Sequence, residues 1–365
     1  ARAAMAAYRE AAREPRPFFE IWQEGYAQTL AAGDDRGLNR LTAAHGSTLM
    51  ERALIDALGR GIGASYFELL KDNLLGLDLG AIHAELAGVE PAQVLGPAPL
   101  TRLHVRHTVG LADPITAGDI PAEERLDDGL PQALEDYVER QGLSYFKVKV
   151  NGDLEGDIER LTAIAALLDG DQTAYQITLD GNEQYHDAGD LLVLLERIER
   201  QLGALYDGVL YIEQPMDRAI SLDPSLAKDI RALADKRPLL IDESDEELDT
   251  FRRALELGYT GVSSKSCKGL IKALANFALV HKLNASGHSH FVSAEDLTTV
   301  PVVSLQQDLV HVAALGIDHL ERNGHHYLRG LDHLSKTERA QCLARHGDLF
   351  IHLHRDGFPE PLLHL

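Results

Sequence analysis

The sequence of 365 residues has few cysteines and aromatic residues and no long apolar run. Its 2 cysteines, Cys267 and Cys342, form no CxxC pair, so neither a disulfide framework nor a zinc knuckle is expected. We interpret Cys267 as a small buried residue. No run approaches the roughly 18 apolar residues of a membrane span, and the first residues lack the apolar core of a signal peptide. We therefore expect a cytoplasmic protein that does not span a membrane.

Positive charge and nucleotide-binding glycine motifs are scarce or absent as well. Lys and Arg number 35 against 57 Asp and Glu, which gives a formal net charge of -22. Such a chain repels nucleic acid and anionic membranes. Neither a GxGxxG nor a GxxxxGK[ST] turn occurs, which disfavours the nucleotide-binding α/β folds. We expect neither nucleic acid nor a membrane as a partner.

The chain divides at about residue 100, where the Pro-rich stretch VLGPAPL separates two patterns. Before it, helical segments alternate with Gly-rich breaks, as in STLMERALIDALGRGIG. After it, short apolar runs alternate with amphipathic helices. The pattern predicts a mainly helical N-terminal capping domain (1–100), a barrel (101–325) and a C-terminal segment (326–365) that packs back on the barrel or the cap.

Eight short apolar runs in the second region have the length and composition of β-strands. They are 103–111, 145–150, 175–180, 208–215, 238–244, 261–266, 291–296 and 316–321. Helical patterns or loops separate them, which predicts an α/β fold with a closed (β/α)8 barrel of the TIM type rather than an open sheet. In such barrels the reactive side chains lie at the C-terminal ends of the strands.

Two lysines share one face of the second expected strand, YFKVKV. Because side chains alternate along a strand, Lys147 and Lys149 point to one side and the apolar residues to the other. Protection of an edge strand against aggregation is one explanation. Catalysis is the other, because a second amine and a nearby cation favour neutral lysine, which is a general base. Lys265 ends the sixth strand on the far side of the barrel, so two amines would flank a substrate.

Acidic residues end several of the other expected strands. Asp180 ends the third, Glu213 the fourth and Asp242 the fifth, and Glu295 follows the seventh. Helix capping explains any one of them. For three consecutive strands we favour a metal site, because converging carboxylates suit Mg2+, with Mn2+ as the alternative, and leave coordination positions for a substrate.

These motifs together resemble the enolase superfamily, in particular the mandelate racemase/muconate lactonizing enzyme family and its muconate-lactonizing-like branch. FKVKV resembles the KxK strand of that family, TLDGNEQY its DxN strand, YIEQP its ExP strand, LIDES its DE strand and SSKSCKGL its KxxKxG strand. The five motifs occur in the family's order, and the resemblance covers most of residues 45–320. The family's N-terminal β-meander is not evident, since the sequence begins in helices.

The resemblance implies a role for each matching position. The Mg2+ ligands would be Asp180, Glu213 and Asp242, with Asn182 and Glu243 orienting them. Lys149 would be the base on one face of the substrate, Lys265 the acid or base on the other, and Lys147 would neutralise the substrate carboxylate. We expect Glu295 to contact the substrate.

The implied chemistry is removal of the proton alpha to a carboxylate, with the enediolate stabilised by Mg2+ and the flanking cations. Racemisation, epimerisation, cycloisomerisation and elimination all begin in this way, and the sequence does not choose between them or name the small carboxylate substrate. We also expect a homo-oligomer.

Three alternatives stay open. A sugar-acid dehydratase of the mandelate-racemase type would use a His-Asp dyad, and His288 and His290 precede the seventh strand, but Lys265 occupies the relevant position on the sixth. An aldolase that forms a Schiff base also needs a lysine inside a barrel. A barrel without catalytic activity would serve for binding. Phe19 and Trp22, in FFEIW, suggest either an aromatic lid or core residues, and we favour the core.

Overall fold

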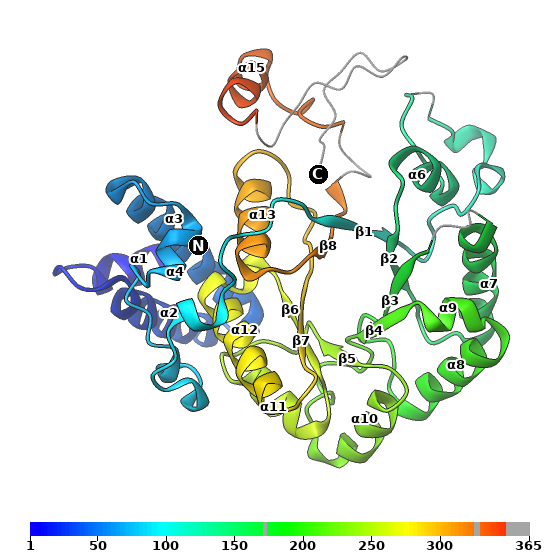
Figure 1. Ribbon diagram of the computed structural model, residues 1–365, viewed down its shortest axis with the longest axis horizontal. Coiled ribbons are helices and arrows are strands. Elements are labelled where there is room, and N and C mark those ends of the chain that lie inside the picture. The colour runs from blue at the N-terminus through cyan, green and yellow to red at the C-terminus, as the bar shows by residue number, and fades with distance from the viewer. Residues whose placement is uncertain (127, 171–173, 325–328, 348–365) are drawn as a thin grey trace. The chain divides into compact units, whose positions relative to one another are not determined.

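The computed structural model describes residues 1–126, 128–170, 174–324 and 329–347. Eight parallel strands form a closed barrel in the order of the sequence (Figure 1), which confirms the predicted (β/α)8 fold. The strands are β1 (His104–Val109), β2 (Tyr145–Lys149), β3 (Gln176–Asp180), β4 (Val209–Glu213), β5 (Leu239–Ile241), β6 (Gly261–Ser264), β7 (Phe291–Ala294) and β8 (His319–Glu321). Each lies within one of the runs expected from the sequence.

Helices fill the N-terminal region and the connections between the strands. The N-terminal helices are α1 (Arg2–Ala11), α2 (Phe18–Asp34), α3 (Arg40–Ile62), α4 (Tyr66–Lys71) and α5 (Pro91–Val94). The later helices are α6 (Leu134–Gln141), α7 (Leu154–Gly170), α8 (Ala188–Gln201), α9 (Gly203–Asp207), α10 (Ala227–Ala234), α11 (Thr250–Leu257), α12 (Leu270–Ala285), α13 (Val303–Leu315) and α15 (Lys336–Arg345). Short 3-10 turns are η1 (Leu79–Ala81), η2 (Ala84–Leu86), η3 (Ala117–Asp119), η4 (Ala122–Glu124), η5 (Pro224–Leu226) and η6 (Ser266–Lys268).

The chain forms two compact units. The first contains the N-terminal helices with β5, β6 and β7, and comprises Ala1–Thr101, Asp217–Glu295 and Gln307–Asp318. The second contains β1 to β4 with β8, and comprises the described residues of Arg102–Met216, Asp296–Gln306 and His319–Leu365. Of the predicted C-terminal segment, 326–328 and 348–365 lie outside the described residues.

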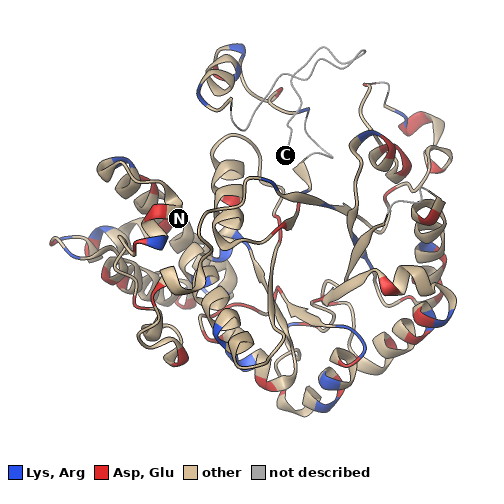
Figure 2. Cartoon of the chain, in the orientation of Figure 1, with Lys and Arg blue, Asp and Glu red and all other residues tan. Residues whose placement is uncertain are grey.

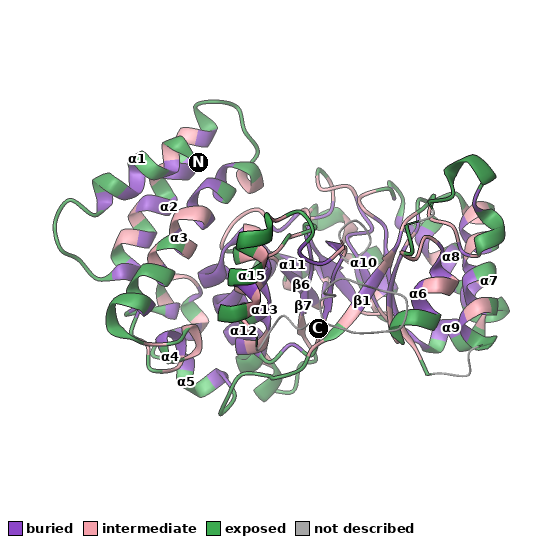
Figure 3. Cartoon of the chain, turned by 90° about the horizontal axis from the view of Figure 1, so that it is seen from above, coloured by how far each residue is buried: buried purple, intermediate pink, exposed green. Residues whose placement is uncertain are grey.

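Helices α1, α2 and α3 of the first unit pack against one another through apolar faces (Figure 3). Phe19 and Trp22 of α2 are 4% and 1% exposed, and their rings stack with centroids 5.5 Å apart. They belong to the core of this bundle, as favoured from the sequence, and form no lid. Gly25 allows the close packing, because a Cβ there would lie 2.6 Å from the ring of Tyr8.

Register places charged residues in a row at the C-terminal ends of β2, β3 and β4 in the second unit. Lys149 pairs with Asp180 across β2 and β3, and Asp180 pairs with Glu213 across β3 and β4. Phe146 and Val148 are fully buried, as expected of the apolar face of β2. Parallel pairing therefore brings together side chains that are far apart in the sequence.

Charged residues of both signs are distributed along the helices, for example along α7 and α8 (Figure 2). Within the described ranges, none of the helices combines the length and the apolar character that a membrane crossing requires.

Candidate active site

One ammonium group in the second unit lies among three buried carboxylates. Lys147 Nζ is 2.9 Å from Asp180 Oδ2, 2.7 Å from Glu213 Oε2 and 3.2 Å from Glu321 Oε2. The side chain of Lys147 is 1% exposed, and those of the three acids are 0–4% exposed. Because an unpaired buried charge is costly, Lys147 is the electrostatic centre of this cluster.

Lys149 lies beside the same cluster but reaches solvent. Its Nζ is 2.5 Å from Asp180 Oδ2, and its side chain is 22% exposed. It also donates a hydrogen bond to Asn182 Oδ1. Asn182 in turn donates its backbone N–H to Asp180 Oδ1 at 2.9 Å, so Asn182 contacts both members of the pair.

The first unit contains a second cluster of the same kind around Asp242, which follows β5. Lys265 Nζ lies 2.5 Å from Asp242 Oδ2, and Lys268 Nζ lies 2.8 Å from Oδ1. Ser263 of β6 donates its hydroxyl to Oδ1 at 2.5 Å. Burial alone would lower the pKa of Lys268, but the carboxylates of Asp242 and Asp245 raise it above its usual value.

The two clusters share one arrangement of lysines. Asp180 pairs with the buried Lys147 and the partly exposed Lys149. Asp242 pairs with Lys268, whose side chain is 4% exposed, and with Lys265, whose side chain is 12% exposed. In each unit, therefore, one amine is enclosed with the carboxylate while the other is partly exposed to solvent.

The positions of Glu295 and Glu243 do not by themselves identify a role for either side chain. Glu295 is 2% exposed, accepts a hydrogen bond of 2.8 Å from the hydroxyl of Ser293 and donates its N–H to Ser264 O. It therefore lies beside the end of β6 in the first unit. Glu243 follows Asp242 in a partly buried position.

The two histidines near β7 lie at the opposite end of the strands from Lys265. The register pairs Gly261, the first residue of β6, with Phe291, the first residue of β7. His288 and His290 precede Phe291 and stack on each other with ring centroids 5.2 Å apart, whereas Lys265 follows the last residue of β6. This geometry disfavours the alternative of a catalytic histidine.

A buried histidine links the N-terminal helices to β6. His311 of α13 is 1% exposed; its Nδ1 lies 2.8 Å from the hydroxyl of Tyr66 and its Nε2 lies 3.3 Å from that of Ser264. Burial lowers the pKa of His311 to about 3, with a smaller contribution from Arg52. The imidazole is therefore neutral at physiological pH and holds the residue that precedes Lys265.

Sequence reasoning missed Glu321 and the site role of Lys268. Glu321 ends β8, contacts Lys147 and accepts a hydrogen bond of 2.7 Å from Thr108. The rule that acids end the strands would have identified it, because the run 316–321 ends in this residue. Lys268 lies in the stretch SSKSCKGL, three residues after Lys265, and its position after the strand gave no sign of its contact with Asp242.

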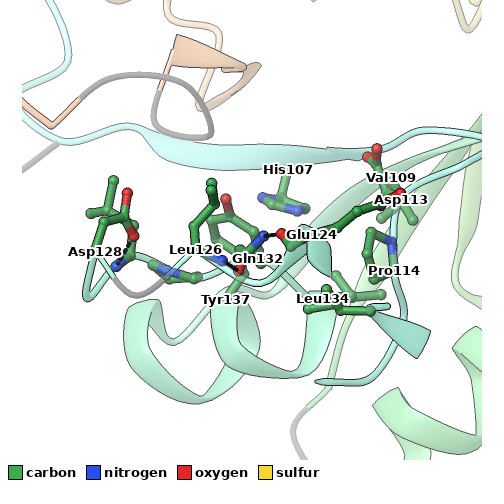
Figure 4. A pocket seen from close by; sticks show the side chains of 13 residues that line it. His107, Val109, Asp113, Pro114, Glu124, Leu126, Asp128, Gln132, Leu134 and Tyr137 are labelled. Atoms are coloured by element: carbon green, nitrogen blue, oxygen red, sulfur yellow. Dashed lines mark hydrogen bonds between the residues drawn. The ribbon is translucent and has the colours of Figure 1, made fainter. Parts of the chain in front are cut away.

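A pocket of about 300 Å³ lies beside β1 in the second unit (Figure 4). It is lined by His107 and Val109 of β1, by the segment that follows, and by Leu134 and Tyr137 of α6. The residues that line it include none of the predicted catalytic or metal-binding residues.

Residues 129–341 match the family described as "Enolase C-terminal domain-like", which is more than half of the chain. The chain belongs to the enolase superfamily. No functionally curated protein matches the sequence.

Solved structures of the enolase superfamily share the fold of this chain. A mandelate racemase/muconate lactonizing protein from Paracoccus denitrificans, crystallised with magnesium, is 16% identical with a TM-score of 0.58, covering 88% of this chain and 73% of its own. Muconate lactonizing enzyme from Pseudomonas putida is 19% identical with a TM-score of 0.51, covering 80% and 65%. A dipeptide epimerase from Enterococcus faecalis is 14% identical with a TM-score of 0.53, covering 88% and 74%. Identities this low show the fold alone.

In the described part of this superfamily member, no three His, Cys, Asp or Glu side chains are grouped as a metal site. The carboxylates are grouped around amines instead. Asp180 and Glu213 nevertheless suit a cation, since both are fully buried, are register partners and contact one ammonium. Carboxylate oxygens are the hard donors that Mg2+ prefers.

Replacing Lys147 by Met tests its role as the centre of the second-unit cluster. We expect Lys147→Met to lower the free energy of unfolding by about 3–5 kcal/mol, because it removes the ammonium from buried carboxylates. In the matched control Lys149→Met, Asp180 keeps Lys147 and the loss should be about 1–2 kcal/mol. Equilibrium urea denaturation at pH 7 measures both, and equal losses would show that Lys147 has no special electrostatic role.

The buried His311 predicts a pH dependence of stability. Its folded pKa lies below the unfolded value of 6.5, so the stability it confers is present above that pH and is lost as the pH falls toward 3. Relative to His311→Asn, which cannot titrate, the wild type should lose about 1 kcal/mol between pH 6.5 and pH 5.5. Parallel urea titrations at the two pH values measure this difference; identical pH dependence of the two proteins would mean that His311 is not buried as described.

Proposed function

We propose that this protein is a Mg2+-dependent enzyme that removes the proton alpha to the carboxylate of a small-molecule substrate. The product would arise by racemisation or epimerisation, by cycloisomerisation or by elimination. Membership of the enolase superfamily supports this class of reaction, and the named structural neighbours include a muconate lactonizing enzyme and a dipeptide epimerase.

The observation that carries the proposal is the repeated pairing of a strand-end aspartate with one enclosed and one partly exposed lysine. A proton-transfer residue must reach the substrate, and Lys149 and Lys265 are the partly exposed members. A purely structural ion pair needs no second amine. Two such lysines on different strands suit chemistry in which one removes a proton and the other returns it.

Asp180, Glu213 and Asp242 would hold the metal ion. Bound there, Mg2+ would offset the carboxylate charges that now pair with lysines, and would stabilise the negative charge that develops on the substrate carboxylate. The magnesium in the P. denitrificans relative agrees with this choice of ion. These residues come from β3, β4 and the end of β5, which are consecutive strands of the barrel.

We assign the proton transfers to the Nζ atoms of Lys149 and Lys265, which act on opposite faces of the substrate. Lys147 supplies fixed positive charge, and Asn182 orients Lys149 and Asp180 through the contacts described above. Lys268 holds Asp242 in the same way that Lys147 holds Asp180. Glu243 and Glu295 are candidates for orienting the metal ligands and for contacting the substrate.

A racemase, an epimerase or a cycloisomerase fits the lysine pair better than a sugar-acid dehydratase of the mandelate-racemase type. That dehydratase would need a catalytic histidine, and His290 lies beyond the N-terminal end of β7. Elimination catalysed by the two lysines is still compatible with the site.

Deuterium uptake from D2O tests the proposal. Wild type is incubated with Mg2+ and a library of amino acids, dipeptides, N-acylated amino acids and sugar acids, and mass spectrometry follows the alpha carbon. We expect uptake into one substrate class. The rate should fall at least about 100-fold with EDTA, in Lys149→Ala or in Lys265→Ala, because each removes a proton-transfer group or the metal.

The matched control is Lys228→Ala, an exposed lysine on α10, which should exchange like the wild type. Uptake that survives EDTA would contradict a metal-dependent reaction. Trapping of a substrate on lysine by borohydride, with no need for metal, would instead indicate the Schiff-base alternative.

A further inference from the structure

Helix α12 begins directly after the turn that carries Lys265 and Lys268, and it has no cap of its own. Its N-cap residue is Gly269, which offers no side chain, and its first turn contains no acidic residue. Leu270 and Ile271 are 4% and 0% exposed, so water does not reach this end of the helix freely. Unsatisfied backbone N–H groups in such a place are costly.

Glu51 of α3 supplies the missing cap from the N-terminal helices. Its Oε1 accepts the backbone N–H groups of Leu270 and Ile271 at 2.5 and 2.8 Å. Its negative charge also lies at the positive end of the α12 dipole. A residue 219 positions away in the sequence thereby fixes the start of this helix.

The carboxylate of Glu51 is enclosed and interacts with N–H donors. Glu51 is 1% exposed, and its Oε2 accepts a hydrogen bond of 2.8 Å from the indole of Trp22. Burial raises the pKa of Glu51 to about 7, although the three hydrogen bonds oppose this shift. If the Glu51 carboxylate were protonated or replaced by an amide, one of its accepting oxygens would become a donor group. That donor would face the N–H donors that now bind the carboxylate.

Glu51 also lies against the turn that precedes α12. A Cβ on Gly269 would lie 3.4 Å from Glu51 Oε2, so the turn fits closely against the carboxylate. Within the turn, Lys268 donates its backbone N–H to Lys265 O at 2.8 Å. Ser266 is anchored to Asp308 of α13 at 2.5 Å. The position of the Lys265 backbone therefore depends on anchors on both sides, and Glu51 is the one contributed by the N-terminal helices.

We propose that Glu51 is a positioning residue for Lys265, acting through the start of α12 and the turn before it. The inference rests on the proposed function, because it assigns to Lys265 proton transfer on one face of the substrate. It predicts that loss of the Glu51 carboxylate impairs the face served by Lys265 and spares the face served by Lys149.

The first measurement is amide hydrogen exchange, which needs no substrate. In Glu51→Gln, peptides spanning residues 265–272 should exchange at least about 10-fold faster, whereas peptides from β2 and β3 should not change. The control is Glu68→Gln: Glu68 completes the capping box of α4, a helix that carries no candidate catalytic residue. It should leave exchange at 265–272 unchanged. Unchanged exchange in Glu51→Gln would overturn the proposal.

The second measurement separates positioning from general loosening. The D2O screen identifies the substrate, and alpha-deuteration is then measured from each of its stereoisomers. The isomer whose exchange is lost in Lys265→Ala is assigned to Lys265, and the isomer whose exchange is lost in Lys149→Ala is assigned to Lys149. Glu51→Gln should lower kcat about 10-fold or more for the Lys265 isomer, with KM within about twofold, and leave the Lys149 isomer within about twofold. Equal losses for both isomers would reduce Glu51 to a structural residue and overturn the proposal.

A milder variant covers the case in which Glu51→Gln does not fold. Trp22→Phe removes one donor to Glu51 while the contacts with Leu270 and Ile271 remain. It should give a smaller loss confined to the Lys265 isomer, and an equal loss for both isomers would again contradict the proposal. If no carboxylate exchanges in the wild type, the proposed function has failed, and amide exchange alone decides whether Glu51 holds the turn.

Discussion

The neutralisation of buried carboxylates by lysines is the constraint on which the site depends. Asp180, Glu213 and Asp242 are 0–1% exposed, and an isolated ionised carboxylate in such a place is strongly disfavoured. Parallel strand pairing brings these acids to the strand ends, and the amines of the KxK and KxxK motifs supply the compensating charge. Within each unit, the ion pairs that neutralise these acids therefore bring amines next to carboxylates.

The N-terminal helices are also connected to the segment around Lys265, the residue to which we assign one of the proposed proton transfers. Glu51 and His311 both reach the neighbourhood of Lys265, one through the start of α12 and the other through Ser264. The N-terminal helices, which contain none of the predicted catalytic residues, therefore take part in fixing the end of β6. Helix α3 is thereby connected to the backbone next to Lys265.

Local patterns in the sequence were enough to predict the strands and the residues at their ends. The alternation in YFKVKV identified the shared face of Lys147 and Lys149, and strand-end position identified Asp180 and Lys265. Contacts between distant parts of the chain could not be predicted from such local patterns. Capping of α12 by Glu51 joins residues 219 positions apart, and helical periodicity marks Glu51 only as one position on a helix. The enclosure of Lys147 by three acids likewise depends on register, which short motifs do not encode.

We propose above that one divalent ion binds to the carboxylates of Asp180, Glu213 and Asp242. Titration of the wild type with Mn2+, followed by electron paramagnetic resonance of the free ion, tests it most directly. We expect one ion per chain, displaced by Mg2+, with affinity reduced at least about 10-fold in Asp180→Asn and in Asp242→Asn alike. An Asp242→Asn variant that binds Mn2+ as tightly as the wild type would show that Asp242 is not a ligand of the ion.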